Sequence, residues 1–417
     1  MLDFTPRAHP FAVLLLCASQ LDAQLPTGTD WVVPSGSQLV YDTSHGPLEL
    51  HSLTIEAGAT LRVEGPQAFV LRALEFVHLE GVLDCSGFDA APVALGSSTR
   101  APELGAPGGP GGGAGGTASW TLDGSTAHGS AGASGSGVQA GQKAGGRGGE
   151  STFALFAGGE NRAGGGGGGR LAADLLYPGF GPAQVGDLAQ AGKDGDPLST
   201  GAMSQQGPAQ GGLPGTSPVF RDATNANDFW GVLDGGPSFG LIVGEAAWPV
   251  GGSGGGAGGD ASTTEVFPMP VWQPVKESKG AGGGGGGGVC LLSTPQLIVG
   301  GGGRILARGG AGASGEGPGP KGATGGASGG GSGGWIVLQT DLLDLSHSQP
   351  ACLNAMGGAG GTASDPQLGL SGSGGNGGPG VIQVHLDPTT GVLLLPPGAS
   401  LHSRGLPDPL QLLPLLP

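Results

Sequence analysis

The sequence has little charge, few aromatic rings and no long apolar segment beyond its N-terminus. Charged residues make up 12% of the 417 residues and aromatic residues 5%, which excludes a highly charged disordered chain. Lys and Arg number 16 against 32 Asp and Glu, and no basic stripe is present, so nucleic acid is a poor partner. No later segment has the ~20 apolar residues that span a bilayer, and we expect no membrane span.

Motifs of catalytic or metal chemistry are also missing. No HxxxH or CxxC spacing occurs, so a transition-metal site has no support. The glycine runs are not phosphate loops, because no Lys-Ser/Thr pair follows them. GxSxG occurs at 251–255 and 330–334, but without the strand-to-helix context of a hydrolase. We therefore expect no catalytic residue, no metal site and no cofactor, and a chain that is not an enzyme.

Glycine is what the sequence has in excess. The 96 Gly and 34 Pro form almost a third of the chain, and short apolar runs alternate with glycine runs. Between Gly280 and Gly310 these runs are Val289–Leu292, Leu297–Val299 and Ile305–Ala307. Each is too short for a helix and is bounded by glycine, which favours buried strands. A slender, repetitive core suits this pattern better than one globular core.

Strand-like alternation is clearest between Trp31 and Gly87. Apolar residues two apart line one face of each expected strand, as in Leu53/Ile55 and Leu83/Cys85. The step from Leu61 to Leu83 is 22 residues, close to one coil of a three-strand solenoid. Each unit ends with a large aliphatic residue, a small residue two positions later, and a glycine. This pattern occurs at 83–87, 305–309, 353–357 and 401–405.

These features predict an all-β fold, a parallel β-helix with long glycine-rich loops. A β-sandwich with disordered glycine-rich insertions is the structural alternative. Collagen is excluded because its glycine triplets lapse at Ala114 and Ser328. Packed polyproline II strands with glycine between them stay an option for residues 104–169.

The N-terminus predicts export. Arg7 and His9 precede the apolar run Phe11–Cys17, and small or polar residues follow toward Ala23. The sequence then divides into a signal peptide at 1–23, N-terminal β-helix rungs at 24–87, a glycine-rich insertion with mixed loops at 88–280, C-terminal rungs at 281–405 and a proline-rich tail at 406–417. The tail is expected to cover the last rung, since solenoid ends need capping.

The mature chain keeps three cysteines, and we predict that all three are free thiols. Cys85 follows the strand alternation of Leu83 and should face the interior. Cys290 lies in an apolar strand and should also be buried. Cys352 directly precedes the inward Leu353, so alternation predicts that it points outward.

One stretch, 218–240, has the side chains of a sugar site. Carboxylates and amides hold sugar hydroxyls, and a Trp ring can stack on the sugar. The candidate carbohydrate-binding residues are Arg221, Asp222, Asn225, Asn227, Asp228, Trp230 and Asp234. The plainer interpretation is that Phe229, Trp230, Val232 and Leu233 pin a long loop to the stack by burying apolar surface.

Three segments together carry a resemblance to a known group of proteins. They are GGSGGGAGGD at 251–260, KGAGGGGGGG at 279–288 and GGGSGGWIVLQ at 329–339. The chain resembles glycine-rich exported bacterial proteins with adhesin- or autotransporter-like β-helical repeats. The resemblance implies a right-handed parallel β-helix and a surface or extracellular role, and it carries over no catalytic residue.

Two functions from different classes fit these expectations. The first is an exported structural or adhesive surface protein without catalytic activity, secreted or held at the cell surface. Its partners would be cell-surface polysaccharide or other surface proteins. The second is a glycan-binding or polysaccharide-active β-helix, with residues 221–234 lining a groove. The first prediction is preferred.

Overall fold

The computed structural model describes fourteen stretches of the chain. They are residues 28–93, 103–118, 145–149, 152–155, 161–162, 165–169, 228–232, 241–245, 251–265, 273–317, 323–349, 351–362, 372–386 and 390–396. The predicted signal peptide and the proline-rich tail lie outside these residues. Within them the structure is nearly all β, with one short 3-10 turn at Thr43–His45, and none of its sheets is closed. The all-β prediction is confirmed.

No helix in this part of the chain is long and apolar enough to cross a membrane.

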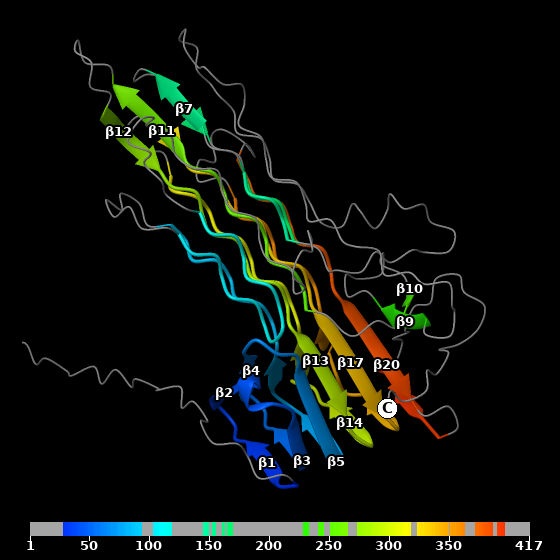
Figure 1. Cartoon of the computed structure of the whole chain (residues 1–417). Helices are drawn as coiled ribbons and strands as arrows, with labels where there is room; N and C mark the ends of the chain where they lie inside the picture. Colours follow the sequence, from blue (N-terminus) through cyan, green and yellow to red (C-terminus); the bar gives the residue numbers. More distant parts are fainter. Residues whose placement is uncertain are drawn as a thin grey trace, which may run out of the picture.

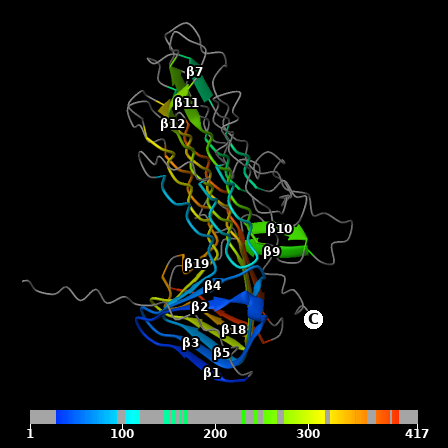
Figure 2. The same ribbon diagram turned by 60° about the vertical axis from the view of Figure 1, so that its left-hand side comes forward.

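Two large sheets form one end of the molecule (Figures 1 and 2). The eleven-stranded sheet contains β1 (Asp30–Val33), β3 (Leu48–Ile55), β5 (Phe69–Leu79), β9 (Asp228–Val232), β10 (Leu241–Glu245), β13 (Val289–Ser293), β14 (Gln296–Val299), β17 (Trp335–Thr340), β18 (Leu342–Asp344), β20 (Val381–Leu386) and β21 (Val392–Leu394). The five-stranded sheet contains β2 (Gln38–Asp42), β4 (Thr60–Glu64), β6 (Val82–Asp84), β15 (Arg304–Leu306) and β19 (Leu353–Asn354).

Two small sheets complete the strand inventory of the described residues. One joins β7 (Thr152–Leu155), β11 (Ala261–Glu265) and β12 (Gln273–Ser278), and the other pairs β8 (Asn161–Arg162) with β16 (Ala323–Thr324). The β7–β11–β12 sheet lies at the opposite end of the molecule from the two large sheets (Figure 2).

Parallel pairing stacks strands that are far apart in the sequence. Leu61 is the register partner of Leu83, 22 residues later. Leu83 in turn pairs with Ile305 on β15, and Ile305 pairs with Leu353 on β19. In the other large sheet β5 pairs with β13, and β13 pairs with β17. The strands before residue 90 and those after residue 288 therefore build one continuous stack.

A single apolar core joins the two large sheets. Alternate side chains of strands such as β4, β6 and β15 point inward, and Leu61, Leu71, Leu83, Leu292 and Ile305 are all fully buried. The ring of Phe69 meets Tyr41 edge-on, with centroids 5.8 Å apart. The alternation read from the sequence thus corresponds to the buried face of the stack.

The glycine segments continue from these strands as a bundle of extended chains (Figure 1). In the segment 325–334 all ten backbone N–H groups donate to carbonyls of neighbouring segments. Every third N–H group donates to the same segment. Its carbonyls accept bonds from three further segments. The six neighbours are 307–316, 253–259, 372–378, 281–287, 358–361 and 166–169. A period of three residues is that of the polyproline II helix, which satisfies no hydrogen bond internally and must find partners outside itself.

Close packing of backbones explains why the bundle is built from glycine. A Cβ added to Gly331 would overlap the carbonyl of Gly285, and one added to Gly329 would overlap the carbonyl of Gly167. No side chain fits between backbones at this separation. The predicted glycine-rich loops, and the alternative of disordered insertions, are therefore wrong for the described segments, which are hydrogen-bonded and largely buried. The polyproline II option fits residues 145–149 and 165–169, and it fits 103–118 apart from the turn at 109–111, where Gly111 has a φ of 69°.

Charged side chains are buried at the end of the bundle near β12. Asp260, Lys279 and Glu316 are at most 7% exposed. The carboxylate of Asp260 accepts from the backbone N–H of Gly280, and that of Glu316 accepts from the N–H of Lys279. These charge-assisted bonds satisfy backbone donors where the glycine segments end.

The three cysteines of the described residues are free and buried. The predictions for Cys85 and Cys290 are confirmed, but the outward position predicted for Cys352 is wrong, since it is only 7% exposed. Strand β19 begins after Cys352, and Ala351 has a φ of 59°, so the alternation of the strand does not extend back to this residue. The Cys352 thiol donates to the Ser348 hydroxyl at 3.4 Å.

Thiol titration is expected to give different counts for native and denatured protein. Burial is the main cause that raises the pKa of the Cys85 thiol, and a hydrogen bond with Cys290 adds to it. Only the thiolate reacts with disulfide reagents, so the native chain lacking residues 1–23 should react slowly at mildly alkaline pH. Unfolded in denaturant without reductant, it should titrate three thiols. A count of one would show a bridge that this register does not contain.

His51 makes the stability weakly pH-dependent. Its Nδ1 lies 2.9 Å from Asp30 and its Nε2 lies 3.4 Å from Glu75. The hydrogen bond to Asp30 is the first cause that raises the pKa of His51 above its ordinary 6.5, and the charge of Glu75 is the second. A raised pKa stabilises the fold fully below about pH 6.5, and this contribution disappears as the pH rises through the folded value.

The pKa of Asp30 is shifted in the opposite direction. Its hydrogen bond from Ser52 is the first cause that lowers this pKa below 3.8, and the bond from His51 is the second. The contribution of Asp30 to the stability of the fold is therefore present above pH 3.8 and is lost as the pH falls through its lower folded pKa. We expect His51→Gln to lower the urea midpoint more at about pH 5.5 than at about pH 8. An equal loss at both pH values would contradict the pairing.

Candidate ligand cleft

Two of the seven residues predicted to bind carbohydrate lie among the described residues. Asp228 and Trp230 lie on β9, which pairs antiparallel with β10 and, through Val232, with Ile382 of β20. This places the backbone of the aromatic segment second from one end of the large sheet, between β10 and β20. The other five, Arg221, Asp222, Asn225, Asn227 and Asp234, lie outside the described residues.

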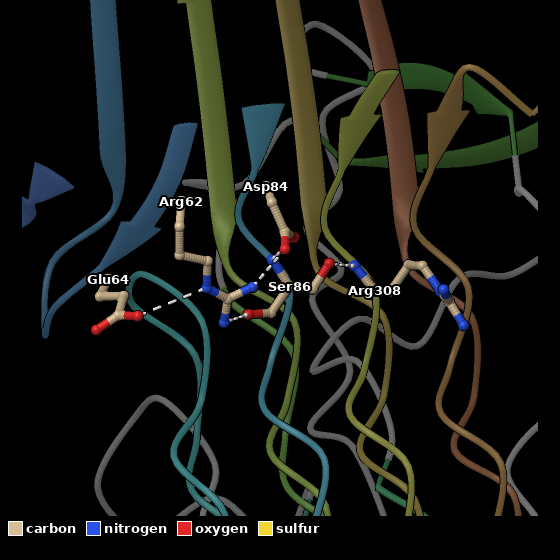
Figure 3. A network of polar contacts seen from close by, with 5 residues as sticks. All are labelled: Arg62, Glu64, Asp84, Ser86 and Arg308. Atoms are coloured by element: carbon tan, nitrogen blue, oxygen red, sulfur yellow. Dashed lines mark hydrogen bonds and ion pairs between the residues drawn. The ribbon is translucent and has the colours of Figure 1, made fainter. Parts of the chain in front are cut away.

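A cleft of about 390 Å³ opens where strands β4, β6 and β15 give way to the glycine bundle. Its volume is in the range of small-ligand sites. It is lined from the first half of the chain by Arg62, Glu64, Asp84, Ser86, Phe88 and Asp89, and from the second half by Leu306 and Arg308. Figure 3 shows the polar network at its centre.

Arg62 is the anchored residue of the cleft. Strand β4 places it directly opposite Asp84 on β6, and its Nη1 lies 2.8 Å from the Asp84 carboxylate. Its Nη2 donates to the carbonyl of Ser86, and its Nε lies 3.7 Å from Glu64 without a hydrogen bond. The guanidinium also stacks 4.2 Å from the centre of the Phe88 ring. These contacts compensate a charge whose side chain is only 17% exposed.

Short polar side chains fix the neighbouring backbone segments around Arg62. The Ser86 N–H donates to the Asp84 carboxylate at 2.9 Å, and the Ser86 hydroxyl accepts from the Arg308 N–H at 3.1 Å. One turn further along, the Asp89 carboxylate accepts from the Ala311 N–H at 2.7 Å. The cleft wall therefore joins segments that are 222 residues apart in the sequence.

Arg308 is the exposed cation of the cleft. Its backbone is held by Ser86, while its guanidinium makes no hydrogen bond or ion pair within the described stretches (Figure 3). Five N–H donors are thus available in a cleft that Asp89 also lines. The arrangement can bind and orient a polar ligand.

The residues of this cleft were not among the predicted site residues, although the sequence contains a signal for them. Arg62 and Asp84 are separated by the same 22 residues as the core pair Leu61 and Leu83. Asp84 occupies the variable position after Leu83 in its five-residue pattern, and Arg308 occupies a variable position after Ile305. Variable positions of a strand pattern point away from the core, where a charged pair can form.

Groups of three or more metal-binding side chains are absent from the part of the chain that the structure describes. In comparisons with known proteins, no family model, no curated protein and no solved structure matches this chain. The function therefore has to be inferred from the geometry alone.

Proposed function

We propose that this chain is an exported structural or adhesive protein of the cell surface, without catalytic activity. In this proposal the stacked strands form a right-handed parallel β-helix that carries the glycine bundle as a stiff extension. The observation that carries it is the three-directional hydrogen bonding of the glycine segments, which continue directly from the strands. Partners would be cell-surface polysaccharide or other surface proteins.

The bundle supports a role in spacing or presentation. A segment of ten residues in polyproline II geometry extends about 31 Å, at about 3.1 Å per residue. Each described central segment is bonded on several sides, so bending it requires breaking hydrogen bonds to its neighbours. Such an element can hold the strand stack away from an attachment point.

The sequence of the N-terminus supports the export that this proposal includes. The charged and apolar pattern before Ala23 is typical of a secretory signal. The acidic composition, with 32 acidic against 16 basic residues, keeps an exposed protein soluble and disfavours anionic surfaces.

The proposal is tested by following the tagged chain in a bacterial host. The purified protein should begin at Gln24, and a C-terminal tag should be found in the medium or be reached by antibody on intact cells. A matched variant lacking residues 2–23 should stay in the cytoplasm. The exported chain should also bind extracted cell-surface polysaccharide in a pull-down without releasing reducing sugar. Retention of the full chain in the cytoplasm, or release of reducing sugar, would overturn the proposal.

Glycan binding is the second candidate function, and the cleft at Arg62 and Arg308 favours it. Here the candidate site differs from the one predicted at residues 221–234. A pure binding role would serve adhesion, whereas a polysaccharide-active role would require catalytic carboxylates placed on either side of a bond.

A further inference from the structure

We propose that the cleft between Arg62, Phe88 and Arg308 is a saccharide site that takes a neutral sugar unit of a polysaccharide. This inference rests on the proposed adhesive function and gives it a site. The cleft is built by residues that the fold already holds in place, since Arg62 has its charge partners and Ser86 fixes the backbone of Arg308. Binding would therefore require little rearrangement.

The charges of the cleft decide which class of ligand it suits. Arg62 is matched by the carboxylates of Asp84 and Glu64, at 2.8 and 3.7 Å. What is left facing the opening is one cation, Arg308, and one carboxylate, Asp89. This remaining pair has no net charge, so overall it neither attracts nor repels an anionic or a cationic ligand. A neutral ligand suits this balance of charge.

The hydrogen-bonding groups suit neighbouring hydroxyls. The Arg308 guanidinium offers only donors, and the Asp89 carboxylate offers only acceptors. The network holds the Arg308 backbone and the Asp89 carboxylate, since the Ser86 hydroxyl accepts from the Arg308 N–H and Asp89 accepts from the Ala311 N–H one turn later. A hydroxyl both donates and accepts, so a pair of adjacent hydroxyls can satisfy both groups. The half-buried ring of Phe88 supplies an apolar wall for the C–H face of a sugar.

The surface next to the cleft allows the ligand to be part of a longer polymer. On the outer glycine segments every third residue faces solvent, about 9 Å apart along the chain. Among these positions Ala311, Ser314, Ala359 and Thr362 carry short side chains, and the Ser314 and Thr362 hydroxyls lie 3.4 Å apart, whereas Met356 and Leu104 are bulky and are 43% and 73% exposed. The short residues at 311, 314, 359 and 362 offer a linear chain a path away from Arg308.

The test measures binding of defined hexasaccharides by isothermal titration calorimetry. The full exported chain is titrated with cellohexaose, maltohexaose, mannohexaose and chitohexaose, and with hexagalacturonate as the acidic counterpart. At least one neutral hexasaccharide should bind, and hexagalacturonate should bind more weakly. Arg308→Ala should weaken the neutral binding about tenfold, as expected for loss of a charge-assisted hydrogen bond. Arg304→Ala, on an equally exposed arginine of β15 outside the cleft, should leave it unchanged.

Each outcome bears on the proposal. Stronger binding of hexagalacturonate, or an equal effect of Arg304→Ala and Arg308→Ala, would overturn it. Absence of binding by all four neutral hexasaccharides would also overturn it. The proposed function fails separately, because cytoplasmic retention of a chain that still binds sugar would refute export while leaving the cleft assignment standing. Both arginine side chains are exposed, so we expect both variants to keep the melting temperature of the unchanged protein. This measurement separates lost binding from misfolding.

Discussion

Replacing Gly331 with alanine is expected to lower the free energy of unfolding by about 3 kcal/mol, the upper end of the usual cost of overpacking. The new methyl group would overlap the carbonyl of Gly285 on the neighbouring segment. That carbonyl belongs to a backbone held by bonds on several sides, so it cannot move aside as a flexible side chain would. Denaturant unfolding of the two proteins measures the difference.

Gly301→Ala is the matched control for this prediction. A Cβ at Gly301 would have only the His347 carbonyl within 4 Å, at 3.7 Å, and Gly301 does not adopt a positive φ. The same change should therefore be neutral or stabilise by about 0.4–1 kcal/mol, because alanine restricts the unfolded chain. If both variants lost the same stability, general loss of glycine flexibility would be the cause, and close backbone packing would not.

Leu71→Ala is expected to cost about 2–5 kcal/mol, the range for a buried leucine cut back to alanine. Leu71 is fully buried on β5 and pairs in register with Leu292 of β13, so the cavity would lie in the core between the two halves of the stack. Thermal and denaturant unfolding should both show the loss.

Leu74→Ala on the same strand gives the internal comparison. Leu74 is 70% exposed, and removing it should change stability by no more than about 0.5 kcal/mol. Leu74 and Phe76 continue the apolar alternation in the sequence, but the structure has a register shift opposite this point, between Leu50 and Ser52 of β3. Similar losses for Leu71→Ala and Leu74→Ala would mean that this irregularity is misplaced.

Local periodicity explains how much of the strand stack could be predicted. Side chains of a strand alternate between two faces, so Leu61, Leu83 and Ile305 could be assigned inward from their own neighbours in the sequence. The 22-residue step from Leu61 to Leu83 also proved to be a true register pair. Cys352 shows the limit of this reasoning, because the turn at Ala351 interrupts the alternation.

The cleft could be predicted only in part, for a different reason. Arg62 and Asp84 are related by a spacing that the core residues share, so their pairing was available from the sequence. The hydrogen bond from the Arg308 N–H to the Ser86 hydroxyl was not, because it joins residues 222 positions apart that become neighbours only when β15 pairs with β6. No local pattern specifies which distant strand becomes the neighbour of β6.

The sequence by itself determined that this chain is all-β, that its apolar runs are strands and which of their faces are buried, because side-chain alternation is a local property. Only the tertiary structure decided what the glycine does. A glycine run has no side chains whose pattern could indicate a buried face or a neighbouring segment. The same glycine sequence is compatible with a loose loop and with a packed polyproline II helix. The choice depends on backbone bonds to distant segments, such as those from 325–334 to its neighbours, and these exist only once the strands have set the segments side by side.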